Sequence, residues 1–157
     1  MSEQPYEIEL VEFDPDSLYA CERHLVTYAT LTGLDRDEIW QRWPEALRKD
    51  GGWGGRKHVE AALALGFNTN PKFKKFDPET PWPCILRVQV PKHWGWKGCW
   101  WRLIYHQGQV YNPTSADSDP NCSGWSMLSI KEFEARYKMC RITSMLQVWM
   151  SITNKLT

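Results

Sequence analysis

The sequence carries no excess of charge of either sign. Its 157 residues include 19 lysines and arginines and 19 aspartates and glutamates, so the formal net charge at pH 7 is zero. No block of like charges occurs along the chain. Proteins that wrap DNA or lie on an anionic membrane surface usually carry strong positive charge. Charge therefore gives no support to either role.

Long apolar runs and an export signal are missing as well. No run approaches the roughly 20 apolar residues that a membrane-spanning helix needs. The first ten residues, MSEQPYEIEL, lack the basic segment and apolar core of a signal peptide. Apolar residues make up 42% and charged residues 24%, which is typical of a soluble globular domain. We expect a cytoplasmic protein.

The cysteines show no metal-binding or disulfide motif. They are odd in number, widely spaced and free of any C-x-x-C pair. This spacing argues against a zinc ribbon and against a secreted disulfide scaffold. We expect mostly reduced thiols, no metal and no cofactor. The five cysteines are Cys21, Cys84, Cys99, Cys122 and Cys140.

Tryptophan, in contrast, is abundant. Tryptophan buries a large apolar area and is also enriched at interfaces. Filling of the core is its ordinary role, and a binding face is the alternative. The chain has ten, of which five fall within twenty residues: Trp82, Trp94, Trp96, Trp100 and Trp101.

The first part of the chain predicts one strand and then helices. Residues 6–13 begin with alternating apolar and acidic side chains, as a half-buried strand does. From 17 to 32, apolar residues recur at three- and four-residue steps, which indicates a helix. Short helices follow Asp35 and Pro44, and residues 56–67 form the next clear helix. The GGWGG segment before it is typical of a loop.

The second part predicts strands. Gln107-Gly108 is the expected turn of a hairpin, and Ser129 is the expected N-cap of a helix over 130–138. Strands are predicted over residues 84–90, 99–106, 109–113 and 139–150. The order indicates one α+β domain over 1–157, with a helical part at 14–66 packed on a mostly antiparallel sheet at 82–150.

Three segments follow one another in a recognisable order: Cys21 with the following HLVTYATLTGLDRDEIW, then GCWWRLIYHQGQVYNP, and last MLSIKEFEARYKMCRITSML. In this order they resemble the papain-like cysteine peptidases. The nearest likeness is to bacterial leader-peptidase-type domains and related small phage-encoded proteins. The resemblance implies a papain-like fold, with Cys21 at the nucleophile position and Asn112 at the Asp or Asn position of the family's site.

The resemblance fails where catalysis would need it. Cys99 occupies the histidine position of that family, and the segment FDPDS has no amide side chain for an oxyanion hole. A peptidase cysteine needs an imidazole to lower its pKa and to protonate the leaving group. A thiol at Cys99 does neither. A non-catalytic domain that binds a partner protein is therefore favoured, in keeping with a phage protein that acts on its host or its host's defences.

Four histidines are candidates to replace the missing one. His93 lies just before the strand and is able to fold back toward Cys21. His24 follows Cys21 by one helical turn. His106 is beside the hairpin turn, about 20 Å from the start of the strand. His58 is expected on a polar, solvated helix face. An active cysteine hydrolase that uses Cys21, Asn112 and His93 is the alternative function.

Cys99 has two interpretations. The ordinary one is a small buried residue at the end of a strand. In the other, Cys21 and Cys99 face each other as a disulfide, a redox pair or part of a soft-metal site with His93 or His24.

A second alternative is nucleic-acid or glycan binding through residues 92–102. Aromatic rings interleaved with cations stack on bases or sugars. Trp53, in the GGWGG loop, would lie beside the same cleft. With Trp53, the candidate binding residues are Trp94, Trp96, Lys97, Trp100, Trp101 and Arg102.

Overall fold

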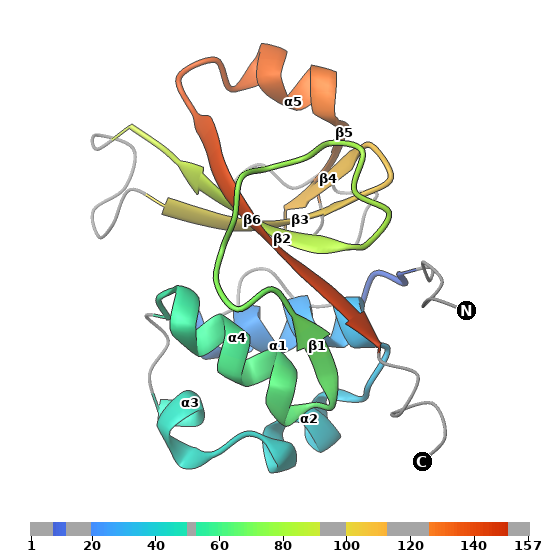
Figure 1. Ribbon diagram of the computed structural model, residues 1–157, viewed down its shortest axis with the longest axis vertical. Coiled ribbons are helices and arrows are strands. Elements are labelled where there is room, and N and C mark those ends of the chain that lie inside the picture. The colour runs from blue at the N-terminus through green and yellow to red at the C-terminus, as the bar shows by residue number, and fades with distance from the viewer. Residues whose placement is uncertain (1–7, 12–19, 50–52, 92–99, 113–125, 151–157) are drawn as a thin grey trace.

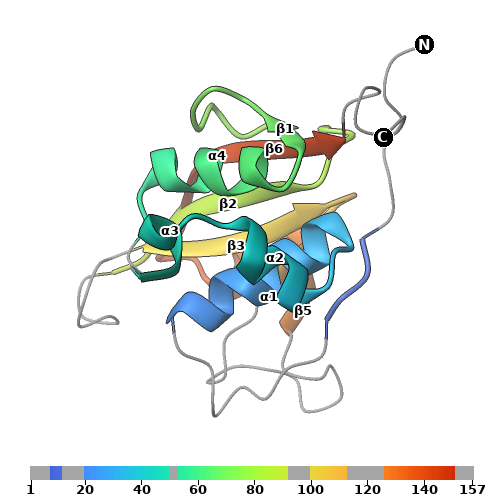
Figure 2. The ribbon, with the colours of Figure 1, turned by 90° about the horizontal axis from the view of Figure 1, so that it is seen from below.

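The computed structural model describes residues 8–11, 20–49, 53–91, 100–112 and 126–150. Within these ranges the chain forms three layers: four helices on one face of a sheet, the sheet itself, and one helix on the other face (Figures 1 and 2). The α+β class predicted from the sequence is confirmed.

The helices of the first layer come first in the chain. They are α1 (Ala20–Thr32), α2 (Arg36–Arg42), α3 (Glu45–Lys49) and α4 (Gly55–Ala64). Gly33 ends α1, because its positive φ of 76° suits glycine and its N–H bonds to the Ala29 carbonyl oxygen at 2.9 Å. The predicted helices are thus confirmed where they are described.

The sheet has six antiparallel strands in the order β1-β6-β2-β3-β4-β5. The hairpin turn is the expected one: Gln107 and Gly108 both have positive φ, 49° and 83°, as a tight two-residue hairpin requires. The strands are β1 (Phe67–Thr69), β2 (Cys84–Gln89), β3 (Trp100–His106), β4 (Gln109–Asn112), β5 (Ser126–Ser129) and β6 (Arg141–Met150).

The second face of the sheet is covered by α5 (Ile130–Arg136). Its capping box is complete: the Glu132 N–H donates to Ser129 Oγ at 3.1 Å, and the Ser129 N–H donates to Glu132 Oε1 at 2.9 Å. These bonds lower the pKa of the exposed Glu132. The cap predicted at Ser129 is confirmed.

The two faces of the sheet carry separate cores. Ile85 and Ile104 belong to the core with α1, α2 and α4. Leu86 and Leu103 belong to the core with α5. Successive side chains of a strand point to opposite faces of the sheet. The residues of β2 and β3 therefore alternate between the helical face, which α1, α2 and α4 cover, and the α5 face.

Three local predictions were wrong. Residues 8–11, the described part of the strand expected over 6–13, are in no strand; the Val11 N–H bonds instead to Thr30 Oγ1 of α1 at 3.2 Å. Strands β1 and β5 were not expected, because three or four residues are too few to display an alternating pattern. Their pairing with β6 and β4 makes them strands.

Candidate functional site

Two arginines face each other across the centre of the sheet. Arg87 of β2 is the direct register partner of Arg102 of β3. By alternation with Ile85 and Ile104, both side chains lie on the helical face. Like charges placed directly opposite in a sheet are destabilising.

Neither arginine has a protein partner for its charge within the described chain. No described carboxylate lies within ion-pair distance of either guanidinium, and neither guanidinium donates a hydrogen bond. The Nε atom of each is buried without a partner. Burial, and then the neighbouring charge of Arg87, lower the pKa of Arg102 to about 10, so Arg102 is still a cation at pH 7.

Each guanidinium packs against an aromatic ring. The Arg87 Cζ lies 4.0 Å from the centroid of Trp100, and the Arg102 Cζ lies 5.8 Å from that of Phe73. Both distances are within the cation–π range. A guanidinium that packs against an aromatic ring keeps its N–H groups available for a ligand.

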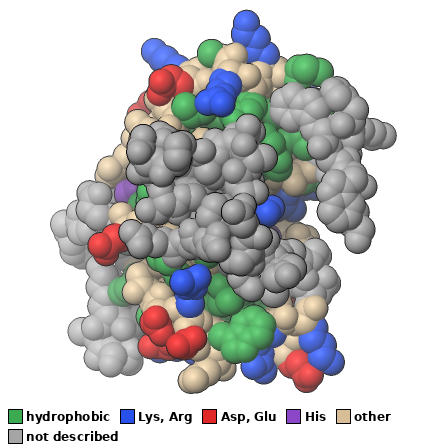
Figure 3. All heavy atoms as spheres, turned by 180° about the vertical axis from the view of Figure 1, so that it is seen from behind, with side chains coloured by type: hydrophobic (Ala, Val, Ile, Leu, Met, Phe, Trp, Pro, Cys, Tyr) green, Lys and Arg blue, Asp and Glu red, His purple; other side chains and the backbone are tan. Residues whose placement is uncertain are grey.

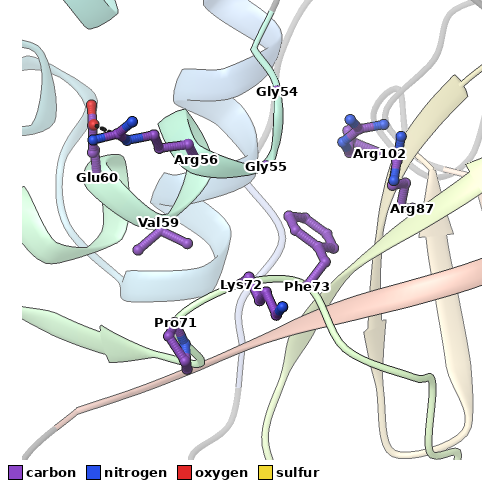
Figure 4. Close-up of a pocket in the computed structure, with 10 residues that line it drawn as sticks. All are labelled: Gly54, Gly55, Arg56, Val59, Glu60, Pro71, Lys72, Phe73, Arg87 and Arg102. Atoms are coloured by element: carbon purple, nitrogen blue, oxygen red, sulfur yellow. Dashed lines mark ion pairs between the residues drawn. The ribbon is translucent and has the colours of Figure 1, made fainter.

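A pocket of about 710 Å³ opens beside the pair. It lies between the start of α4, the segment of Lys72 and Phe73 after β1, and the two arginines (Figure 4). Its one lining carboxylate, Glu60, pairs with Arg56 at 3.6 Å. Lys72, Arg87 and Arg102 thus form a cationic lining with no carboxylate partner in the described chain. We call this site the arginine pocket.

The start of α4 adds further positive potential. Gly54 is the N-cap and has no side chain to bond the first-turn amides. A Cβ on Gly55 would lie 3.2 Å from Phe73 Cδ1, so glycine here lets the ring sit close to the helix start. A helix N-terminus carries a partial positive charge and exposed N–H groups, which favour anions.

Behind the pocket lies a buried tyrosine–histidine pair. The Tyr28 hydroxyl donates to the His58 carbonyl oxygen at 2.9 Å and lies 3.0 Å from His58 Nδ1. Since the hydroxyl proton is used on the carbonyl, Nδ1–H is the donor to the tyrosine oxygen. His58 Nε2 is then the acceptor nitrogen, and it is buried without a hydrogen-bond partner.

The prediction that His58 is solvated was wrong. Its side chain is 0% exposed, because it faces α1 and Trp53 rather than water. Burial, then the charges of His24 and Arg102, hold the pKa of His58 well below its usual range. His58 is therefore neutral at pH 7. Its ring centroid lies 6.1 Å from that of Phe73, which also lines the pocket.

Trp53 belongs to this core and not to an exposed flap. It is 6% exposed, its Nε1–H donates to the Leu47 carbonyl oxygen at 3.3 Å, and its ring stacks on His24 at 3.9 Å. A tryptophan so enclosed does not present its ring to a ligand. The glycines around it are typical of a loop, but the large apolar area of the indole favours burial.

The two tryptophans of β3 point to opposite faces of the sheet. Trp100 is 37% exposed and packs against Arg87, which lines the arginine pocket. Trp101 faces the α5 side, where its ring centroid lies 5.4 Å from that of Tyr137. Of the predicted binding residues that the structure describes, only Arg102 lines the pocket and only Trp100 contacts another residue of that lining, Arg87. His93, Trp94, Trp96, Lys97 and Cys99 lie outside the described residues.

Asn112 lies on the α5 face of the sheet. Its neighbour Val110 on the same face packs in the α5 core, and its register partner is Ser126. Asn112 is buried, and its Oδ1 has no hydrogen-bond partner among the described residues. The backbone of Cys21 is part of α1, which packs on the other face, and its side chain lies outside the described residues. The sheet therefore separates Asn112 from the helix that carries Cys21.

The starts of α1, α4 and β3 lie at the same end of the molecule (Figures 1 and 2). The helix start that carries Cys21 is thus on the side of the arginine pocket. In the described part of the chain, no three histidine, cysteine or acidic residues are placed to hold a metal ion. Nor does a described helix have the length and apolar character to cross a membrane.

The sequence alone did not identify some residues of the arginine pocket as parts of a site. These are Gly54, Gly55, Lys72, Phe73 and Arg87. One signal was available: Arg87 is the only charged residue in the strand segment CILRVQV. Whether Arg87 belongs to a site depends on which residue of β3 lies opposite it. Local sequence does not specify that pairing.

Comparison of the chain with protein-family models, with curated protein sequences and with solved structures finds no match.

Proposed function

We propose that this chain is a non-catalytic domain that binds an acidic segment of a partner protein in the arginine pocket. The observation that carries the proposal is the Arg87–Arg102 pair, two stacked cations with no carboxylate partner in the described chain. A papain-like scaffold that has lost its histidine, and a phage protein directed at a host protein, fit this proposal.

A protein partner suits this site better than a nucleic-acid chain. Arginine and tryptophan are the residues that most often dominate protein interfaces, and here Trp100 packs against Arg87. A nucleic-acid groove needs a continuous cationic track. On the face seen in Figure 3, described basic and acidic side chains are interspersed, and the net charge of the chain is zero.

The test is binding of a defined acidic peptide. We expect a 12-residue peptide rich in glutamate to bind the intact chain, measured by calorimetry and by tryptophan fluorescence. Arg87→Ala and Arg102→Ala should each weaken binding about tenfold or more, because each removes a charged donor from the pocket. The affinity should also fall as salt rises.

The matched control is Arg56→Ala. Arg56 lines the same pocket, but its side chain is 93% exposed and already paired with Glu60. The Arg56→Ala substitution should change the affinity for the acidic peptide by less than about twofold. Equal binding of a lysine-rich peptide, or arginine variants that bind as the parent chain does, would refute the proposal.

A cysteine hydrolase that uses Cys21 is the second candidate function. The specific observation in its favour is His24, one helical turn after Cys21, whose ring is held by stacking on Trp53 at 3.9 Å. With Asn112 on the other face, His24 or His93 would have to act without it.

Selective alkylation decides this candidate. If Cys21 is a nucleophile, iodoacetamide at pH 6–7 should label it at least tenfold faster than Cys140, and His24→Ala should remove much of the difference. Burial raises the pKa of Cys84 and of Cys140, which makes them slow internal references. Uniform or absent labelling, read by mass spectrometry, would exclude the hydrolase.

A further inference from the structure

From the donor count of the arginine pocket, we infer that the group it holds is a phosphoryl group on a side chain of the partner. This inference rests on the proposed function and specifies its ligand. The argument comes from the donors that converge on the pocket and from the charge they present.

The donors exceed what a carboxylate can accept. Each guanidinium offers five N–H groups, and neither Arg87 nor Arg102 donates one to the described protein. A carboxylate offers about four lone-pair sites on its two oxygens, and two bidentate arginines use all of them. Lys72 and the free amides at the start of α4 would then have no acceptor. A phosphoryl group presents three terminal oxygens and can accept from both arginines and from these further donors.

The charge leads to the same ligand. A phosphate monoester carries about −1.5 to −2 at pH 7, against −1 for a carboxylate. Arg87, Arg102 and Lys72 supply three positive charges without a carboxylate partner in the described chain. The uncapped start of α4 faces the same pocket (Figure 4). A dianion neutralises the repulsion between the two arginines more completely than a monoanion does.

The geometry favours arginine over a simple positive charge. Trp100 and Phe73 lie within cation–π distance of the Arg87 and Arg102 guanidiniums. A planar guanidinium matches phosphate oxygens in pairs, whereas an ammonium group acts as a point charge. Replacement of Arg102 by lysine keeps the charge but removes the fork.

The experiment uses three peptides that differ at one residue: serine, phosphoserine or glutamate within the same acidic sequence. By calorimetry at pH 7.5, the phosphoserine peptide should bind at least tenfold tighter than the glutamate peptide. Arg102→Lys should remove most of that preference while affinity for the glutamate peptide changes little. Circular dichroism and urea unfolding of Arg102→Lys would show that the fold is retained.

The pH dependence gives an independent readout. The second pKa of a phosphate monoester is about 6, so affinity for the phosphoserine peptide should rise from pH 5.5 to 7.5. Affinity for the glutamate peptide should change less over the same range, since its carboxylates are already ionised. Inorganic phosphate should displace the phosphoserine peptide at millimolar concentration.

The outcomes separate the two proposals. If the glutamate peptide binds as tightly as the phosphoserine peptide, the phosphoryl inference is refuted and the acidic-partner function stands. If inorganic phosphate binds but neither peptide does, a free phosphate is the ligand and the partner-protein function is refuted. If a single-stranded oligonucleotide binds more tightly than the phosphopeptide, both are refuted. Arginine variants with unchanged phosphopeptide affinity would also refute the inference.

Discussion

Replacement of Trp43 by alanine is expected to lower the free energy of unfolding by about 3–5 kcal/mol. Trp43 is 2% exposed, and its Nε1–H donates to the Ala61 carbonyl oxygen at 3.1 Å. Its ring meets Tyr28 edge-on at 5.6 Å and Trp53 at 5.0 Å. Alanine would leave a cavity where α2 and α4 meet α1. Because the free energy of unfolding of a domain is only about 5–15 kcal/mol, this substitution would remove a large part of it.

The matched control is the same substitution at Trp100. Trp100 is 37% exposed, so alanine there should cost about 1 kcal/mol or less, mainly from the lost contact with Arg87. Urea unfolding followed by circular dichroism measures both variants. Equal losses at the two positions would contradict the core described around Trp43. Trp100→Ala should instead weaken ligand binding, which separates packing from recognition.

Stability is expected to fall as pH drops below about 6.5, and His58 should account for a large share of the fall. The pKa of His58 in the folded chain is well below its usual range, because of burial first and the nearby His24 and Arg102 next. The unfolded chain binds a proton near pH 6.5 and the folded chain does not. Below that pH, stability should therefore drop by up to about 1.4 kcal/mol per pH unit from this group.

His58→Asn isolates this contribution. Asparagine keeps an N–H close to the position of Nδ1, so it can still donate to the Tyr28 hydroxyl at this buried site. It carries no titratable proton. The difference in unfolding free energy between the parent chain and His58→Asn, measured from pH 7.5 to 5, should shrink or reverse as the pH falls. A difference that stays constant with pH would contradict the burial of a neutral His58.

Local sequence predicted the elements whose signals lie within a few residues. The helix that ends at Gly33, the turn at Gln107-Gly108 and the cap at Ser129 all follow from backbone geometry or from orphan amide groups. These depend on neighbours in the chain, so no tertiary information was needed. The apolar segments of β2 and β6 were recognisable for the same reason.

The candidate site was predicted only in part. Arg102 and Trp100 were named from the mixture of aromatic and basic residues in one segment. Arg87, Lys72 and Phe73 come from other segments and join them only through strand register and the packing of α4 on the sheet. The papain-like resemblance predicted a site at Cys21 and Asn112. Strand alternation places Asn112 on the α5 face, whereas the helix that carries Cys21 packs on the other face of the sheet.

The local sequence specifies the division into a helical part and a sheet part, together with the caps and turns that limit them. The burial of His58 and Trp53 depends on how the helices pack against one another, and the meeting of the two arginines depends on the pairing of β2 with β3. Side-chain direction in a strand alternates with every residue. A shift in register of one residue would move Arg87 to the other face, and register is set by pairing between segments far apart in the chain.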